Sequence, residues 1–153
     1  MKLKNSDLEA MVSNPSYQKL FTAKFDDILL VLEIRRQNED IKPALQAYIG
    51  TKQALIERYC DKDLKTGKAV SGPQGQFSFT QVPGSLEKFR EKYNELLNKE
   101  VEVNIKKIEI STAAISSVSK WSGADISILY PFINIIKATS SAKVKPLKAV
   151  SKV

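Results

Sequence analysis

The longest helical pattern in the chain is LFTAKFDDILLVLEIRRQNEDIKPALQAYIGTKQALIERY, residues 20–59. Its apolar residues recur at intervals of three and four, as on one helix face, so we expect them to be buried. Pro43 lies inside the pattern and either kinks one helix or splits it into two. No Gly or Ser cluster marks a loop there, which favours a single kinked helix, and the two-helix alternative stays open. The two expected stripes are Leu20, Phe21, Phe25, Ile28, Leu29 and Leu32, then Ile41, Leu45, Tyr48, Leu55 and Tyr59.

A second amphipathic helix is predicted from Ser85, its expected cap, to about Lys99. We expect it to pack antiparallel against residues 20–59 as a long helical hairpin. The connecting residues 61–84 are rich in Gly and Pro, and their two short strand-like runs favour a small β-hairpin. The apolar stripe of this helix comprises Leu86, Phe89, Tyr93, Leu96 and Leu97.

Strand patterns flank the two helices. Residues 101–110 alternate apolar and polar side chains, with a phase slip at the central lysine pair that predicts a bulge. We expect this strand to pair with residues 1–4. A Ser-x-x-Glu capping box at Ser6 predicts a short helix, which Asn14 and Pro15 end. The expected fold class is α+β: a long antiparallel helical hairpin with a small antiparallel sheet and a flexible basic C-terminal tail.

The positive charge is concentrated at the C-terminus. The chain has 153 residues, which predicts one domain, and 24 basic against 17 acidic residues for a net charge of +7. Five of the basic residues follow residue 136 and no acid does, so the first 136 residues carry 19 basic and 17 acidic residues, a net of +2. We therefore divide the chain into a domain over residues 1–136 and a basic tail over residues 137–153, disordered or ordered on a partner.

The residue inventory excludes several kinds of active site. There is no histidine and only one cysteine, Cys60, so Ser-His-Asp, Cys-His and histidine–metal sites cannot form. The acidic turn at residues 61–67 departs from a calcium loop in the positions of its Gly and Glu. No Gly-rich loop has the Gly-Lys-Ser/Thr ending of a phosphate cradle. We expect a protein that is not an enzyme, with no cofactor, no metal and no small-molecule substrate.

The expected partner-binding residues lie near the C-terminus. Trp121 is either an interface anchor or a plug at one end of the core. Residues 126–136 are uncharged but too short for a membrane span, which needs about 20 residues, so no membrane contact is expected. Their isoleucines either fold back on the hairpin or dock on another chain, and Pro131 favours docking because it disrupts a helix. The predicted partner-binding set is Trp121, Ile133, Ile135 and Ile136.

The tail lysines give a weaker prediction of nucleic-acid binding. Clustered lysines contact phosphates regardless of base sequence. The tail has no aromatic residue and no Arg, so it lacks the stacking groups of a single-strand binder. The lysines concerned are Lys137, Lys143, Lys145, Lys148 and Lys152.

Several stretches are distinctive when they are taken together and in order: MKLKN (1–5), ALIERY (54–59), FREKYNELL (89–97) leading into VEVNI (101–105), DIS (125–127) and LYPFI (129–133). They resemble a family of small tailed-bacteriophage proteins of unknown function. The likeness covers about residues 1–135 and departs from the family pattern in residues 111–121 and after residue 136. It includes no catalytic signature.

The resemblance implies a viral origin. With the absence of catalytic groups, it predicts a non-catalytic phage protein, a minor virion component or assembly factor that contacts other phage proteins or self-associates. Its expected location is the virion or the host cytoplasm. The alternatives are a small host-takeover inhibitor of a bacterial enzyme and a nonspecific nucleic-acid binder acting through the tail.

Overall fold

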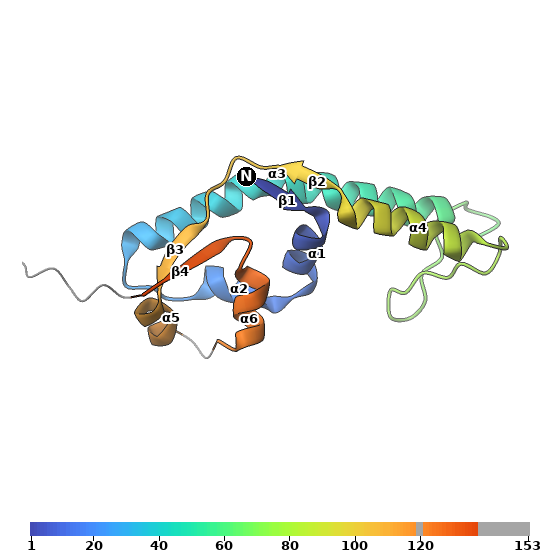
Figure 1. Cartoon of the computed structure of the whole chain (residues 1–153). Helices are drawn as coiled ribbons and strands as arrows, with labels where there is room; N and C mark the ends of the chain where they lie inside the picture. The colour runs from blue at the N-terminus through green and yellow to red at the C-terminus, as the bar shows by residue number, and fades with distance from the viewer. Residues whose placement is uncertain (119–120, 138–153) are drawn as a thin grey trace, which may run out of the picture.

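The computed structural model describes residues 1–118 and 121–137, and within them the chain is mixed helix and sheet, as the predicted α+β class requires (Figure 1). One helix, α3, is much longer than the others and runs along the whole molecule. The elements are β1 (Lys2–Lys4), α1 (Asn5–Ser13), α2 (Pro15–Thr22), α3 (Ile28–Tyr59), α4 (Ser85–Asn98), β2 (Glu100–Glu102), β3 (Ile108–Ser111), α5 (Thr112–Val118), α6 (Gly123–Leu129) and β4 (Ile133–Ile136).

The helix α3 continues through Pro43 for 32 residues, so the single-helix prediction is confirmed. Its predicted start is wrong. The helical pattern from residue 20 is broken after Thr22, and α3 begins only after Asp27, whose carboxylate accepts hydrogen bonds from the N–H groups of Leu29 and Leu30 at 2.9 and 3.3 Å. An Asp in this position satisfies N–H groups that have no partner inside the helix.

The break also changes which face of α3 is buried. Three residues of the predicted stripe, Ile28, Leu29 and Leu32, are 74%, 72% and 54% exposed. The non-helical residues 23–27 reset the helical phase, so a stripe that continues from α2 does not continue on the same face of α3. The residues of α3 that are buried are Leu30, Ile34, Gln37, Ile41 and Tyr48.

The second half of α3 and the helix α4 lie side by side in an elongated arm (Figure 1). Aromatic rings stack along this arm: Phe89 lies against Phe79 at 4.7 Å and against Tyr93 at 5.6 Å between ring centroids. Gly84, with φ of +77°, precedes the first turn of α4. The predicted Ser85 cap is wrong, because the Ser85 hydroxyl instead donates to the Phe79 carbonyl at 3.1 Å.

Two small sheets replace the single sheet that was predicted. The pairing of β1 with β2 is antiparallel, with Lys2 opposite Glu102, so the prediction that the N-terminus pairs with this strand is confirmed. The predicted ten-residue strand is wrong in its length. The first part of the predicted strand forms β2, and residues 103–107 then leave that sheet. The chain enters a different sheet as β3, which pairs in parallel with β4 and places Ile108 opposite Ile133. The phase slip at the lysine pair therefore marks a change of partner.

Two local predictions need correction. The capping box at Ser6 is wrong, because α1 begins two residues earlier, at Asn5, and the Asp7 carboxylate accepts from the Lys4 N–H at 2.9 Å. The predicted hairpin in residues 61–84 is reduced to two isolated bridges, Lys62 with Ala69 and Ser71 with Phe77. The end of the first helix at Asn14, with Pro15 opening α2, is confirmed.

The core lies between the first half of α3, the helices α1, α2 and α6, and the sheet of β3 and β4. No helix among the described residues is long and apolar enough to cross a membrane. The largest side chains that are almost completely inaccessible are Leu8, Leu20, Ile41, Ile110, Leu129, Phe132 and Ile133.

Candidate functional site

The predicted partner-binding isoleucines lie in different surroundings. Ile133 is 1% exposed in the core, so the prediction that it docks on another chain is wrong. The argument from Pro131 fails because this segment folds back as a strand, β4, and not as a helix. Ile135 packs against the same core. Ile136 is 38% exposed, and partner binding there stays a prediction.

Trp121 packs against the hydrophobic core, in agreement with the alternative that it closes one end of the domain. Its indole nitrogen is buried and has no hydrogen-bond partner among the described residues. Lys137 is exposed at the end of β4. The other predicted nucleic-acid residues, Lys143, Lys145, Lys148 and Lys152, lie outside the described residues.

The surface that sequence reasoning missed is the connection between α3 and α4, residues 60–84, which we call the tip loop. It lies at the far end of the arm (Figure 1). Connections without helix or strand are uncommon beyond about 12–15 residues and usually serve a function. The length of this connection follows from the sequence alone. The predicted β-hairpin, however, assigned part of it to strands, so a long loop was not expected.

One carboxylate holds the two ends of the tip loop together. Asp61 Oδ1 accepts from the Gln81 N–H at 2.7 Å, and Oδ2 accepts from the Thr80 hydroxyl at 2.7 Å. The backbone N–H of Asp61 donates to the Ser78 carbonyl at 2.7 Å. Burial raises the pKa of the Asp61 carboxyl, but the hydrogen bonds outweigh it and hold the pKa well below the usual range of an aspartate.

A second set of contacts reinforces this closure. The Gln81 amide accepts from the Lys62 N–H at 2.7 Å and donates to the Lys62 carbonyl at 2.8 Å. Asp63 caps the turn inside the loop by accepting from the N–H groups of Lys65 and Thr66 at 2.8 and 2.7 Å. The loop thus has a defined shape although it contains no helix or regular strand.

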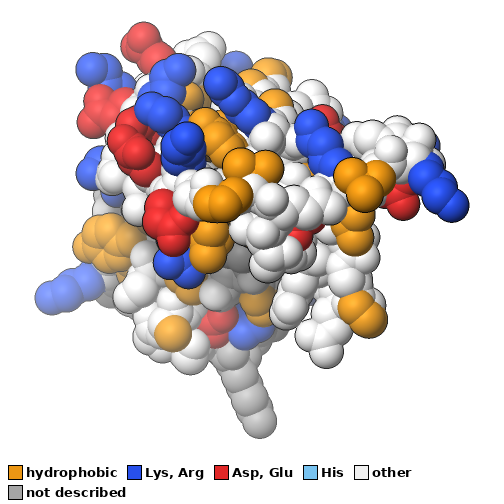
Figure 2. All heavy atoms as spheres, turned by 90° about the vertical axis from the view of Figure 1, so that its right-hand side faces the viewer, with side chains coloured by type: hydrophobic (Ala, Val, Ile, Leu, Met, Phe, Trp, Pro, Cys, Tyr) orange, Lys and Arg blue, Asp and Glu red, His pale blue; other side chains and the backbone are white. Residues whose placement is uncertain are grey.

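Hydrophobic side chains stand on the outside of this ordered loop. Leu64 is 97% exposed, Val82 is 63% exposed and Val70 is 42% exposed. Seen from the end of the arm, hydrophobic side chains are interspersed with lysine and arginine side chains (Figure 2). Surface side chains of this kind, held on a rigid support, suit contact with another macromolecule.

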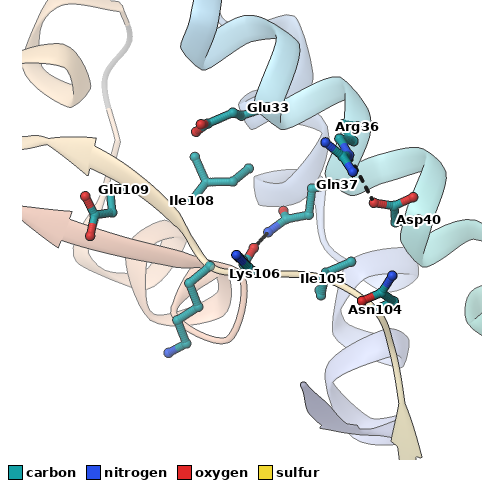
Figure 3. Close-up of a pocket in the computed structure, with 10 residues that line it drawn as sticks. Glu33, Arg36, Gln37, Asp40, Asn104, Ile105, Lys106, Ile108 and Glu109 are labelled. Carbon is teal, nitrogen blue, oxygen red and sulfur yellow. Dashed lines mark hydrogen bonds and ion pairs between the residues drawn. The ribbon is translucent and has the colours of Figure 1, made fainter.

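A groove of about 510 Å³ lies between α3 and residues 104–109 (Figure 3). Its lining mixes acidic and basic side chains, with Arg36 and Asp40 joined at 3.8 Å. Gln37 forms its floor by donating to the carbonyls of Lys106 and Phe132 at 2.9 and 2.8 Å. These bonds attach residues 104–109 to α3. The polar side chains of the groove therefore serve to hold the fold together, and they do not require a ligand.

Two charged clusters also have structural explanations. Asp125 in α6 accepts from the Ser16 hydroxyl at 2.6 Å and from the Lys19 ammonium at 3.0 Å, which ties α6 to α2. The Ser16 hydroxyl bond, followed by bonds from Ser122 and Lys19, holds the pKa of Asp125 well below its ordinary value. Both partners in α2 come from one helical turn and leave no open position for a ligand.

The second cluster joins three helices. Glu9 accepts from the Lys52 ammonium at 2.8 Å and from the Tyr48 hydroxyl at 2.7 Å, and the Tyr48 hydroxyl lies 3.4 Å from the Tyr93 hydroxyl. Burial raises the pKa of Glu9, but the bonds from Lys52 and Tyr48 lower it by more. Burial, together with the bonds to Tyr93 and Glu9, raises the pKa of Tyr48 above that of an ordinary tyrosine.

The remaining reactive group is Cys60, which is buried at the start of the tip loop. Burial raises the pKa of its thiol and so disfavours the nucleophilic thiolate. Among the described residues, no group of three or more acidic or cysteine side chains is placed to hold a metal ion. Comparison with known proteins finds no relative: no protein-family model, no curated protein and no solved structure matches the chain.

Proposed function

We propose that this protein is a non-catalytic binding protein that contacts another protein through the tip loop. The observation that carries the proposal is that hydrogen bonds fix the backbone of this loop while its hydrophobic side chains are exposed. The side chains of Asp61 and Gln81 hold its ends in place by four hydrogen bonds, while Leu64 remains 97% exposed at its surface. Val82 and Val70 are exposed on the same loop, and loops positioned by a folded scaffold commonly carry binding residues.

The elongated arm supports the same function. It carries the tip loop away from the core, so a partner can surround the loop without touching the rest of the fold (Figure 1). The resemblance of residues 1–135 to small tailed-phage proteins adds a biological setting: a minor virion component or an assembly factor. That setting rests on the resemblance alone.

A photo-reactive amino acid at position 64 tests the proposal in the cell that expresses the protein. We expect a cross-linked adduct of defined mass, because Leu64 would face the partner. The matched control is position 12, since Val12 is also an exposed hydrophobic residue, at 52%, but lies on α1. Equal adducts at both positions, or none at position 64, would contradict the proposal.

The identity of the adduct separates the biological alternatives. A particle protein encoded with this chain supports the assembly role, and mass spectrometry of purified virions then shows whether the protein stays in the particle. A host enzyme supports the host-takeover alternative instead.

A further inference from the structure

The start of α3 is apolar on every side. Residues 28–32, Ile-Leu-Leu-Val-Leu, are five consecutive hydrophobic residues, and successive residues of a helix are about 100° apart around its axis. They cannot all face the core. Leu30 is buried, whereas Ile28, Leu29 and Leu32 point to the other side and are 74%, 72% and 54% exposed. We call these three residues the α3 ridge.

A hollow of about 350 Å³ lies beside the α3 ridge. Its walls include Phe21 and Phe25, from the end of α2 and the link to α3, and Val31 and Arg35 from α3 itself. Val31 and Arg35 adjoin Ile28 and Leu32 on the helix surface, so a raised apolar strip and a recess lie next to each other. Such a surface can be covered by the same surface of a second copy about a two-fold axis, with the two ridges in contact and the two hollows beside them.

The charges around the α3 ridge have a polarity that fits the same partner. Exposed Asp26 precedes the ridge, and exposed Arg35 follows it. When two copies of α3 run antiparallel, aligning Asp26 with Arg35 of the second copy also aligns Leu29 with Leu32. At each end of the contact, Asp26 of one copy then lies opposite Arg35 of the other copy. A parallel arrangement would set like charges against each other, which is unfavourable.

We propose that the α3 ridge is the contact of a homodimer in which two α3 helices pack antiparallel about a two-fold axis. The occupant of the exposed apolar face is thus a second copy of this chain. The contact lies at the opposite end of α3 from the tip loop, so the proposal is independent of the binding function assigned to that loop (Figure 1).

Sedimentation equilibrium of the full chain at several concentrations tests the proposal. We expect the wild-type protein to form a dimer and Leu32→Asp to be a folded monomer with the far-UV circular dichroism spectrum of the wild type, because the Leu32 side chain is 54% exposed within one chain. The matched control is Val12→Asp, an equally drastic change of an exposed hydrophobic residue, 52% exposed on α1, which should leave the dimer intact. A monomeric wild type, or a Leu32→Asp protein that still forms the dimer, would overturn the proposal.

Charge exchange tests the antiparallel alignment without placing a charge in the apolar contact. Asp26→Arg and Arg35→Asp should each weaken the dimer, since each creates two like-charge pairs across the axis. The double variant restores opposite charges and should recover the wild-type dissociation constant. A double variant as weak as the single variants would overturn this alignment. None of these outcomes depends on whether position 64 cross-links to another protein.

Discussion

At the scale of single residues, Asp61 has the largest structural effect in the tip loop. Its carboxylate joins Thr80 and Gln81, which are about twenty positions away in the sequence, to the end of α3. Asp63 accepts a similar number of hydrogen bonds, but all of them come from its own turn. Asp61 therefore closes the whole loop, whereas Asp63 stabilises only a local turn. Variants of the two residues can test these two effects separately.

The pKa of Asp61 predicts how the loop responds to acid. Because the folded state lowers this pKa, the ionised carboxylate stabilises the closed loop above the ordinary aspartate pKa of about 3.9. The stabilisation declines as the pH falls below that value and is lost once the pH passes the lower, folded pKa. The protection of residues 61–82 against hydrogen exchange, relative to the intrinsic exchange rate at each pH, should fall over this range, and Asp61→Ala should show the lower protection already at neutral pH.

Asp63→Ala is the control for this experiment. It should accelerate exchange only around Lys65 and Thr66, whose N–H groups lose their acceptor. Equal acceleration across the whole loop in both variants would show that Asp61 has no special part in closing it.

At the scale of elements, glycine positions report on helix stability and on turn geometry. Gly50 lies inside α3, and a Cβ added there meets no atom within 4 Å. Gly50→Ala should raise the free energy of unfolding by about 0.5–1 kcal/mol, because Ala loses less backbone entropy in a helix. Chemical denaturation measures the change.

Gly84→Ala is the opposite case among the glycines. Its Cβ would also meet no atom within 4 Å, but φ of +77° is a left-handed conformation that L-residues rarely adopt. We expect this variant to be less stable than the wild type. A gain in stability at Gly84 would mean that the turn before α4 adopts another backbone conformation.

One side chain of α3 contacts the segment in which the chain changes its sheet partner after β2. The Gln37 side chain is 4% exposed, and its amide donates to two carbonyls, those of Lys106 and Phe132. Gln37→Leu leaves both carbonyls without this donor and should lower the free energy of unfolding by about 1–3 kcal/mol. Gln46→Leu, at an exposed position of the same helix, should change it by less than about 0.5 kcal/mol. Equal effects would contradict the role given to Gln37.

At the scale of the whole molecule, all of the buried hydrophobic residues that the structure describes lie between residues 3 and 133. Removal of residues 137–153 should therefore leave the Tm unchanged. If the tail lysines bind nucleic acid, the full chain should bind duplex DNA with a log–log salt slope of about −0.9 per phosphate neutralised, and the truncated chain should not bind. Binding that survives truncation would place the site on the folded domain.

The core itself is centred on α3. Ile41 is 0% exposed in the middle of this helix, and Ile41→Ala should cost about 2–5 kcal/mol of unfolding free energy. Leu32→Ala on the same helix should cost far less within one chain, because Leu32 is 54% exposed. A large loss at Leu32 in a monomeric protein would show that this residue belongs to the core after all.

The sequence by itself determined where several of the helices and strands form. Spacing of three and four, the Asn14–Pro15 boundary and the alternation after residue 100 are local properties, and the structure has α1, α3, α4 and β2 there. The absence of histidine likewise excludes every catalytic chemistry that needs an imidazole, because no folding of the chain can supply a missing side chain.

Only the tertiary structure decided which face of each helix is buried and which strands pair with each other. Ile28, Leu29 and Leu32 have the same spacing as core residues, but five non-helical residues before α3 turn them to the surface. β3 pairs with β4 rather than extending β2, and Ile133 is buried as a result. Periodicity specifies the angle between side chains on one element, whereas burial depends on where the neighbouring elements lie, and those contacts form between residues far apart in the sequence.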